Sequence, residues 1–254
     1  MIMQKNTQVK TDAEIEIMKK AGQICAQALK KVLNEIKPGA VLSYLDQVAK
    51  AEIERNGATS SFMTVDSYGW TICTTVNEQV VHGIPTQRRL KEGDIVGIDI
   101  GAQFKGYHSD MATTIGVGKI SQDAEDFLKV GKNTLNVAIS KAKANFHIGD
   151  ISSAIQSNVE SANYAVVKNL TGHGVGRELH EEPIIPGFGR KGKGPKILEN
   201  MVLAIEVIYA KGAGEVKLES DDWTISTVDG SLGGLFEQTV AVTENGPIVL
   251  TPYL

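Results

Sequence analysis

Two acidic residues stand inside apolar stretches of this chain, and they constrain its fold more than any other feature. Asp99 lies in the run Ile95-Val96-Gly97-Ile98-Asp99-Ile100, and Glu206 interrupts the apolar residues 201–208. Both runs are short and rich in β-branched residues, which predicts strands. A buried carboxylate is costly unless it is paired, protonated or bound to a metal. The fold must therefore pair, protonate or bind a metal to each of these two carboxylates.

A predicted hairpin places a third carboxylate beside Asp99. The strand at 95–104 runs into Lys105-Gly106, a turn signal, and the chain returns through residues 107–117. Folding this hairpin brings Asp99 and Asp110 within direct or diagonal reach across the strand pair. Two like charges at that separation repel each other unless a cation lies between them.

The second half of the chain supplies two more candidate ligands. Glu237 lies in a predicted strand at 235–242, and His173 lies among glycines at 171–176, in a predicted glycine-rich loop. Taken singly, each has an ordinary alternative, such as an arginine partner for Glu237 or a turn position for His173. Four carboxylates and one imidazole favour Mn, Fe(II) or Co over Zn. Their charge suffices for two divalent ions, which at about 3.5–4 Å apart can activate a water molecule.

Two further histidines are candidates for catalysis. His82 ends a short predicted strand before a turn, and His180 follows His173 by seven residues. Either one is explained equally well as a loop residue. Beside a metal site, each could instead hold a substrate carbonyl or move a proton. His108 and His147 have the weakest case for a functional role.

The same order of elements occurs twice along the chain. Thr11 and Glu14 form a capping box at the start of the first helix. Helices are predicted at about 12–36, 43–57, 121–142 and 150–166, and strands at about 70–117, 201–210, 223–228, 235–242 and 247–250. This pattern predicts an α+β fold with helices on one face of a mainly antiparallel sheet. We expect one catalytic domain, residues 1–254, with pseudo-symmetric halves at about 11–118 and 119–254 and the site between them.

Composition excludes several classes of protein. The formal net charge of −4 and the pI of about 5.8 argue against nucleic acid as the main ligand. No apolar run approaches the ~20 residues of a membrane span, and the first ten residues lack a signal-peptide core. Cys25 and Cys73 are too few for a disulfide framework, so we expect buried, reduced thiols. A cytoplasmic monomer without a membrane partner is the expectation.

Five ordered blocks of sequence resemble the type I methionine aminopeptidases. The blocks are residues 76–85, residues 93–99 with Asp110 eleven residues further on, residues 172–176 with 180–183, residues 201–206, and residues 237–240. The similarity runs from about Thr11 to the C-terminus. It implies the pita-bread fold, which is the pseudo-two-fold α+β arrangement with helices on the outer face of the sheet.

The resemblance also implies a set of ligands. Two divalent ions (Co, Mn or Fe(II), with Zn possible) would be held by Asp99, Asp110, His173, Glu206 and Glu237. In the family, the positions of Asp110 and Glu237 bridge both metals. The Asp99 position serves one metal, and the positions of His173 and Glu206 serve the other.

The implied activity is removal of the N-terminal methionine from nascent proteins when the second residue is small. In the family, a water or hydroxide bridging the metals attacks the carbonyl after the first residue, and the Glu206 position takes the proton. The positions of His82 and His180 contact the scissile amide. The implied partners are nascent polypeptide N-termini, with transient proximity to the ribosome.

The wall of the implied methionine pocket departs from the family pattern. An aromatic residue is usual where Val65 stands, a proline where Gly69 stands, and an aromatic residue where Leu179 stands. The candidate substrate-binding residues are then His82 and His180 together with Phe62, Tyr68, Cys73 and Trp223. Without the resemblance, Cys73 and Trp223 would be interpreted as packing residues.

Two other functions stay open at this point. A proline-specific aminopeptidase or dipeptidase shares the five ligands but usually carries an additional N-terminal domain. With the first helix predicted at about residue 12, we expect no such domain in this chain. A non-catalytic binding protein on the same fold is the other alternative, although such proteins tend to lose ligands.

Overall fold

The computed structural model describes residues 9–254. The expectation that the N-terminus lacks a signal peptide concerns mainly residues 1–8, which lie outside the described residues. Within the described part, no helix combines the length and the apolar character that a membrane crossing needs.

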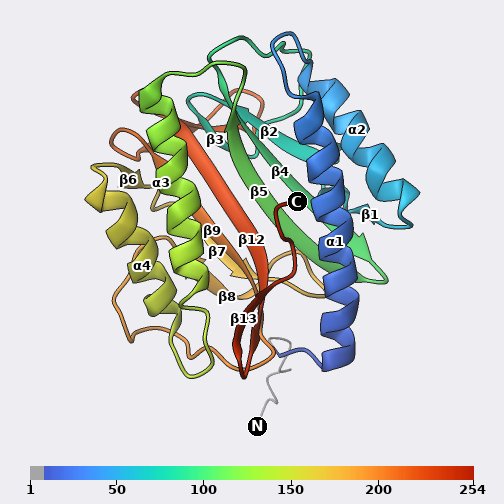
Figure 1. The fold of residues 1–254 in the computed structure, drawn as a ribbon, viewed down its shortest axis with the longest axis vertical. Helices are drawn as coiled ribbons and strands as arrows, with labels where there is room; N and C mark the ends of the chain where they lie inside the picture. The colour runs from blue at the N-terminus through green and yellow to red at the C-terminus, as the bar shows by residue number, and fades with distance from the viewer. Residues whose placement is uncertain (1–8) are drawn as a thin grey trace.

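Two pairs of helices cover one face of a large antiparallel sheet (Figure 1). One pair is α1 (Asp12–Glu35) with α2 (Leu42–Arg55), and the other is α3 (Gln122–Ile139) with α4 (Ile148–Ser161). The capping box predicted for the first helix is present, since the Thr11 hydroxyl accepts from the Glu14 N–H and the Glu14 carboxylate accepts from the Thr11 N–H. The predicted α+β class, with helices on one face of the sheet, is confirmed.

The large sheet joins strands from both halves of the chain. Its order is β1 (Thr59–Ser60), β4 (Ile95–Phe104), β5 (Tyr107–Gly116), β12 (Gly233–Thr243), β9 (Val202–Ala210), β7 (Thr171–Gly174) and β8 (Glu181–Pro186). Three more strands attach to it: β2 (Ile72–Val76) to β4, β6 (Ala165–Val166) to β9, and β13 (Gly246–Val249) to β12. A small second sheet contains β10 (Val216–Leu218), β11 (Ile225–Thr227) and β3 (Gln79–Val81), and a 3-10 turn, η1, spans Phe62–Thr64.

Alternation along the central strands separates the apolar core from the acidic residues. Ile98 and Ile100 of β4 belong to the apolar cluster with the residues of α1 and α2. Ile205 and Val207 of β9 pack in the cluster that contains α3 and α4. Successive side chains of a strand point to opposite faces. Asp99 and Glu206 therefore point away from the helices.

The two halves meet where β5 lies beside β12, and side chains complete this seam. The Thr114 hydroxyl accepts from the Leu235 N–H at 3.0 Å and donates to the Leu235 carbonyl at 2.9 Å. The Tyr253 hydroxyl lies 2.6 Å from the carbonyl oxygen of Ala112 and 3.2 Å from that of Glu237. The C-terminal segment reaches this position by running from β13 back over the seam (Figure 1).

Several predicted element boundaries were wrong. The second helix begins at Leu42, because Val41 already has the extended conformation of an N-cap, and not at Ser43. The fourth helix begins at Ile148 and ends at Ser161. Two residues later, Asn163 has a φ of 59°, which is incompatible with a continued helix. Residues 165–166 instead form β6. The third helix ends at Ile139, and the strand expected at 223–228 is confined to β11.

Candidate metal centre

Strand register places three of the predicted ligands in one row across the sheet. Asp99 on β4 lies opposite Ala112 on β5, and Ala112 lies opposite Glu237 on β12. Glu237 in turn lies opposite Glu206 on β9. Directly opposed side chains share a face, so the three carboxylates project from the same side of the sheet.

The remaining two ligands, Asp110 and His173, are each displaced by two residues along the strands from this row. Asp110 lies opposite Gly101, which is two residues beyond Asp99, so the two aspartates are diagonal neighbours. This was one of the two arrangements expected from the hairpin. His173 on β7 lies opposite Ala204, two residues before Glu206. All five predicted ligands therefore line one cavity on the face of the sheet away from the helices.

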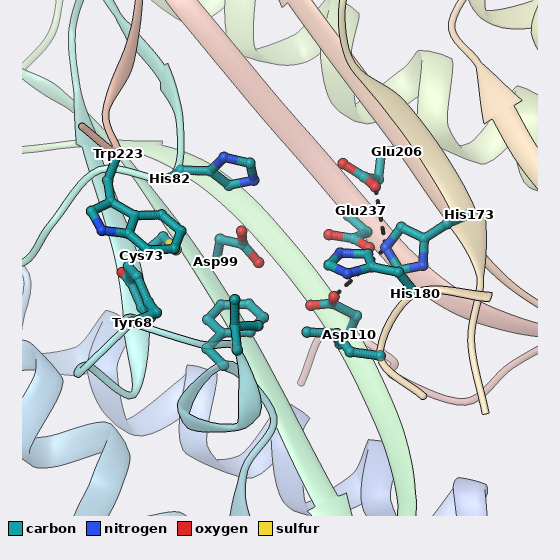
Figure 2. Close-up of a pocket in the computed structure, with 13 residues that line it drawn as sticks. Tyr68, Cys73, His82, Asp99, Asp110, His173, His180, Glu206, Trp223 and Glu237 are labelled. Atoms are coloured by element: carbon teal, nitrogen blue, oxygen red, sulfur yellow. Dashed lines mark ion pairs between the residues drawn. The ribbon is translucent and has the colours of Figure 1, made fainter. Parts of the chain in front are cut away.

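The donor atoms of four of these residues, Asp110, His173, Glu206 and Glu237, are close together (Figure 2). One donor atom each from Asp110, His173 and Glu237 all lie within 4.8 Å of one another. Nε2 of His173 is 3.6 Å from Oε1 of Glu206 and 3.9 Å from Oδ2 of Asp110. These separations are too long for hydrogen bonds but short enough for a shared cation.

Burial makes the charged form of each carboxylate unfavourable. Burial raises the pKa of Asp99 to about 7. It also raises the pKa of Asp110 and of Glu206 well above their usual values, and the neighbouring Asp99 carboxylate adds to both. The pKa of Glu237 rises for the same reason, with Asp110, Glu206 and Asp99 contributing after burial. A divalent cation among these groups would reverse the effect, because it stabilises the ionised forms.

The residues fit a divalent metal. Three carboxylate oxygens, Asp99 Oδ1, Asp110 Oδ1 and Glu237 Oε1, are buried without a hydrogen-bond partner among residues 9–254. Nδ1 of His173 donates to the Gly174 carbonyl at 2.8 Å, which fixes the proton on that nitrogen. Burial lowers the pKa of His173 to about 4, so Nε2 presents a lone pair toward two carboxylates. Acceptors that face each other repel unless a proton or a cation lies between them, and these separations are too long for a hydrogen bond.

Glycines bring His173 to this place. A Cβ at Gly172 would lie 2.6 Å from the Ala204 carbonyl oxygen, and one at Gly174 would lie 2.3 Å from the Glu182 carbonyl oxygen. The segment is therefore strand β7, paired with β8 and β9, and the prediction of a glycine-rich loop here was wrong. Glycine permits the close approach of neighbouring backbones, a use that strand propensity does not reveal.

Both candidate catalytic histidines line the same cavity. The ring of His180 contacts that of His173 edge-on, with centroids 4.4 Å apart. His82 follows β3 with a φ of 57°, a left-handed conformation that is uncommon outside glycine. Burial lowers the pKa of both His82 and His180, and the nearby His180 lowers that of His82 further. Both imidazoles are accordingly neutral at pH 7 and can each donate one hydrogen bond.

The other two histidines lie elsewhere, as their weak case suggested. His108 is buried, with Nδ1 3.0 Å from the Ser61 hydroxyl and Nε2 2.9 Å from the Gln103 amide. His147 is the residue before α4, where its N–H donates to the Asp150 carboxylate. Neither contributes to the lining of the cavity.

An apolar pocket adjoins the five ligands. The cavity measures about 130 Å³, close to the ~150 Å³ that admits a benzene-sized group in a protein core. Tyr68 packs edge-on against Trp223 at 4.9 Å and against Phe62 at 6.4 Å. Trp223, Tyr68 and Cys73 lie on the side of the cavity away from Glu206, Glu237, Asp110 and His173 (Figure 2), and Phe62 belongs to the same apolar cluster. Val65 and Leu179 also line the cavity. The resemblance implies the same wall, in which both residues depart from the family pattern.

Both cysteines are buried and unpaired, as predicted, but they have different surroundings. The Cys25 thiol donates to the Ile100 carbonyl on the helix-covered side of β4. Cys73 lies opposite Asp99 in the register and lines the cavity. Without the resemblance, Cys73 and Trp223 would be interpreted as packing residues, and both in fact line the cavity, whereas Cys25 does not.

Comparison with known proteins identifies the family that this fold and site define. The profile of Metallopeptidase family M24 matches residues 16–244, and the chain belongs to this family. It is 45% identical over 242 residues to methionine aminopeptidase 1 of Bacillus subtilis, which covers 95% of this chain and 98% of the relative. The fold matches the crystal structure of methionine aminopeptidase from Thermotoga maritima with a TM-score of 0.94 and 40% identity, covering 96% and 98% of the two chains.

A prolidase is a more distant relative. The prolidase from Pyrococcus furiosus matches with a TM-score of 0.79 and 26% identity, and the match covers 96% of this chain but 65% of the prolidase. The comparisons confirm both the resemblance and the pita-bread fold. They favour the methionine aminopeptidases over the proline-specific peptidases, because identity and coverage are both higher.

Proposed function

We propose that this chain is a metal-dependent aminopeptidase that removes an N-terminal methionine when the second residue is small. One observation carries the proposal: an acidic, histidine-containing centre and an apolar pocket share a single cavity. The centre suits hydrolysis of a peptide bond, and the pocket suits an unbranched apolar side chain. The near full-length similarity to methionine aminopeptidases supports the same conclusion.

Five side chains would hold the metal. Their donor set of four carboxylates and one imidazole nitrogen suits two divalent ions of the Mn, Fe(II) or Co type, with Zn as a further candidate. Asp110 and Glu237 lie on the two strands that meet at the seam, which places them to serve both ions. Asp99 lies on one side of them, and His173 and Glu206 lie on the other. When bound, the ions would supply a nucleophilic water at neutral pH and polarise the scissile carbonyl.

The side chains around the centre would then position the substrate and move protons. The Glu206 carboxylate, itself one of the five ligands, would accept the proton that the attacking water gives up. His82 and His180 are neutral at pH 7, so each can donate a hydrogen bond to an amide carbonyl oxygen and stabilise the charge that develops there. The neutral rings avoid adding positive charge next to the metal.

The pocket would select the first residue of the substrate. Phe62, Tyr68, Cys73 and Trp223 enclose a space lined by ring edges and a thiol, which favours a flexible thioether side chain. Val65 stands where the family usually has an aromatic residue. Its side chain still lines the cavity and offers an apolar surface to the first residue.

The setting of the enzyme follows from its substrate. Nascent polypeptide N-termini are the proposed partners, which places the protein in the cytoplasm with transient proximity to the ribosome. Nucleic acid is not proposed as a main ligand, given the net charge of −4. We further propose that residues 1–254 act as one catalytic domain and as a monomer.

The first experiment is an assay of metal-stripped protein on Met-Ala-Ser, Leu-Ala-Ser and Xaa-Pro peptides, with Mn, Fe(II), Co or Zn added back singly. Metal-dependent release of methionine alone is the expected result. Release of leucine at a comparable rate would contradict the proposed selectivity of the pocket. Cleavage before proline would assign the chain to the proline-specific peptidases, and no cleavage with any metal would refute the proposal.

The ligand set needs a test that does not depend on turnover. Asp110→Ala and Glu237→Ala should each bind less than the wild-type amount of metal, because each removes a carboxylate placed to serve both ions. Metal content is measured by elemental analysis after equilibration with Mn. Asp126→Ala is the matched control, since Asp126 is an exposed residue of α3. Wild-type metal content in both ligand variants would exclude these residues.

A further inference from the structure

The loop that carries His180 is held by an ion pair with Lys10, a residue near the N-terminus. Lys10 Nζ lies 2.6 Å from Oε2 of Glu181, the residue that follows His180. The side chains are only 4% and 8% exposed, so the pair is nearly withdrawn from solvent. The two partners are 171 residues apart in sequence. A buried pair of this kind is strongly disturbed when one partner is removed, because the other charge is left uncompensated.

The Glu181 carboxylate also closes the loop. Its Oε1 accepts from the Arg177 N–H at 2.8 Å and from the Glu178 N–H at 3.2 Å. One carboxylate thus fixes both ends of residues 177–181, while its second oxygen takes the Lys10 charge. The backbone leaves room for this arrangement only because residue 176 is glycine. A Cβ at Gly176 would lie 2.5 Å from Lys10 Cε and 2.6 Å from Glu181 Oε1.

The backbone of Lys10 is held in place by contacts with the residues just before β9. Its N–H donates to the Asn200 carbonyl at 2.9 Å, and the preceding Val9 forms an isolated bridge with Met201. Two residues after Asn200, β9 begins and leads to Glu206. Lys10 therefore connects the loop 177–181 to the segment that leads into β9, the strand that carries the proposed ligand Glu206.

A second contact from the same segment holds the other end of the loop. Glu14 on α1 accepts from Arg177 Nη2 at 2.9 Å and from the Tyr107 hydroxyl. The Arg177 guanidinium lies over the Tyr107 ring, 4.7 Å from its centroid. Arg177 and Glu181 are thus both tied to residues 10–14, and His180 lies between them.

The pairing of β7 with β8 links the position of Glu181 to the residues that line the cavity. Glu181 opposes Gly174 in the pairing of β7 and β8, and Gly174 is adjacent to His173. The edge-on contact between His173 and His180 depends on this register. A shift of Glu181 would move His180 relative to the metal centre.

We propose that Lys10 is a positioning residue for the reaction: its ion pair with Glu181 fixes the loop 177–181 so that His180 faces the substrate amide. The proposal rests on the proposed function for the role of His180. Lys10 lies outside the cavity lining and would contact neither substrate nor metal. Loss of Lys10 would slow the reaction because the His180 imidazole would be displaced.

A double-mutant cycle with kinetics tests this. Lys10→Met keeps most of the side-chain length and removes the charge. We expect a decrease in kcat of about tenfold with KM changed less than about threefold, because groups that act on the transition state affect kcat. In a His180→Ala background, Lys10→Met should change kcat less than about twofold, because the residue through which it acts is gone. Equal effects of Lys10→Met in both backgrounds would overturn the proposal.

A spectroscopic arm separates this inference from the function on which it rests. In metal-loaded protein with ¹⁵N-labelled histidine, the imidazole signals of His180, assigned by their loss in His180→Ala, should shift in Lys10→Met, while those of His147 should not. This readout needs no turnover, so it decides the positioning role even if methionine peptides are not cleaved. Unmoved His180 signals would refute the inference.

Controls distinguish positioning from general destabilisation. Arg55→Met breaks another 2.6 Å ion pair, with Glu52 on α2, and should leave kcat within about twofold of wild type. If Lys10→Met does not fold, Glu181→Gln replaces it in the same cycle, since it breaks the pair from the other side. An Arg55→Met variant as impaired in kcat as Lys10→Met would assign the effect to stability and refute the proposal.

Discussion

Thr239 and Asp110 exchange two hydrogen bonds across the seam between the halves. The Thr239 hydroxyl accepts from the Asp110 N–H at 2.9 Å and donates to the Asp110 carbonyl at 2.7 Å. The Thr239 N–H in turn donates to the Thr251 hydroxyl at 2.9 Å. Asp110 and Glu237 lie on opposite sides of this seam. One threonine hydroxyl therefore helps set the distance between the two carboxylates proposed to serve both metal ions.

Thr239→Val should weaken metal binding without touching a ligand. Valine matches threonine in shape but leaves two buried backbone groups of Asp110 without a partner, at about 1–3 kcal/mol each. We expect the free energy of unfolding to fall by about 2–6 kcal/mol. Affinity for Mn should fall about 10–100-fold, the usual loss when a group behind a ligand is removed. Urea unfolding and metal titration by calorimetry measure the two effects.

The matched control for Thr239→Val is Thr243→Val on the same strand. The Thr243 hydroxyl donates to the Gly246 carbonyl in the turn to β13, away from the cavity. This variant should lose stability but keep its metal affinity. Unchanged affinity in Thr239→Val would show that the seam hydrogen bonds serve folding alone.

Metal removal should make stability depend on pH in a defined direction. Burial raises the pKa of Asp99 to about 7, and the other three carboxyls also have raised pKa values. Between pH 6.5 and 8 the unfolded carboxyls are already ionised, so the folded state holds more protons, and stability falls as pH rises. The lowered pKa values of His82, His173 and His180 oppose this increasingly as pH falls toward 6.5, where the unfolded histidines become charged.

The measurement is the melting temperature of metal-free and Mn-loaded protein across that pH window. The gap between the two curves should widen from pH 6.5 to 8, because the bound ions stabilise the ionised carboxylates. Asp99→Asn, which has no proton to lose, should flatten the metal-free curve. Parallel curves for metal-free and metal-loaded protein would contradict the assignment of buried, proton-holding carboxyls.

His82→Ala should separate catalysis from metal binding. The imidazole lines the cavity but lies outside the cluster of Asp110, His173 and Glu237, so metal content should stay at the wild-type level. We expect kcat to fall by roughly 10²–10⁴-fold, the scale of a lost acid–base group. His147→Ala is the control, because that histidine does not line the cavity. An unchanged kcat in His82→Ala would remove this residue from the mechanism.

Glu14 should contribute to stability at neutral pH and cease to do so in acid. The Thr11 N–H and the Tyr107 hydroxyl lower the pKa of Glu14 to about 2. A carboxyl with a lowered folded pKa stabilises the protein above its unfolded pKa of about 4.5, and this stability is lost as pH falls toward 2.

Glu14→Gln tests this contribution. Because the side chain is 24% exposed, solvent weakens its interactions, and we expect a loss of roughly 1–2 kcal/mol at pH 7. The difference from wild type should vanish near pH 2, as followed by urea unfolding at several pH values. Glu16→Gln, an exposed neighbour on α1, should change stability by less than about 0.5 kcal/mol. A Glu14→Gln deficit that persisted at pH 2 would contradict the pH-linked role.

Much of the fold could be predicted because its signals are local. Capping residues, helical periodicity and the Lys105-Gly106 turn indicated the helices and the central hairpin. The edge of the sheet was less predictable, since β7 contains two glycines and its pairing depends on the close approach of β8 and β9. The short β6, placed in a helix by periodicity, exists because it pairs with Ala210 and Tyr209 on β9. Such long-range contacts are invisible to local propensity.

The sequence by itself determined which groups had to be compensated. A carboxylate within an apolar strand is costly in any fold, so Asp99 and Glu206 pointed to a shared cation, with Asp110, Glu237 and His173 as its other ligands. The tertiary structure decided which of these groups meet. Register aligned Asp99, Glu237 and Glu206 in one row, and the contact of Lys10 with Glu181 across 171 residues fixed the loop of His180. The physical reason is that the cost of burial belongs to each residue, whereas its relief depends on distances that only strand pairing sets.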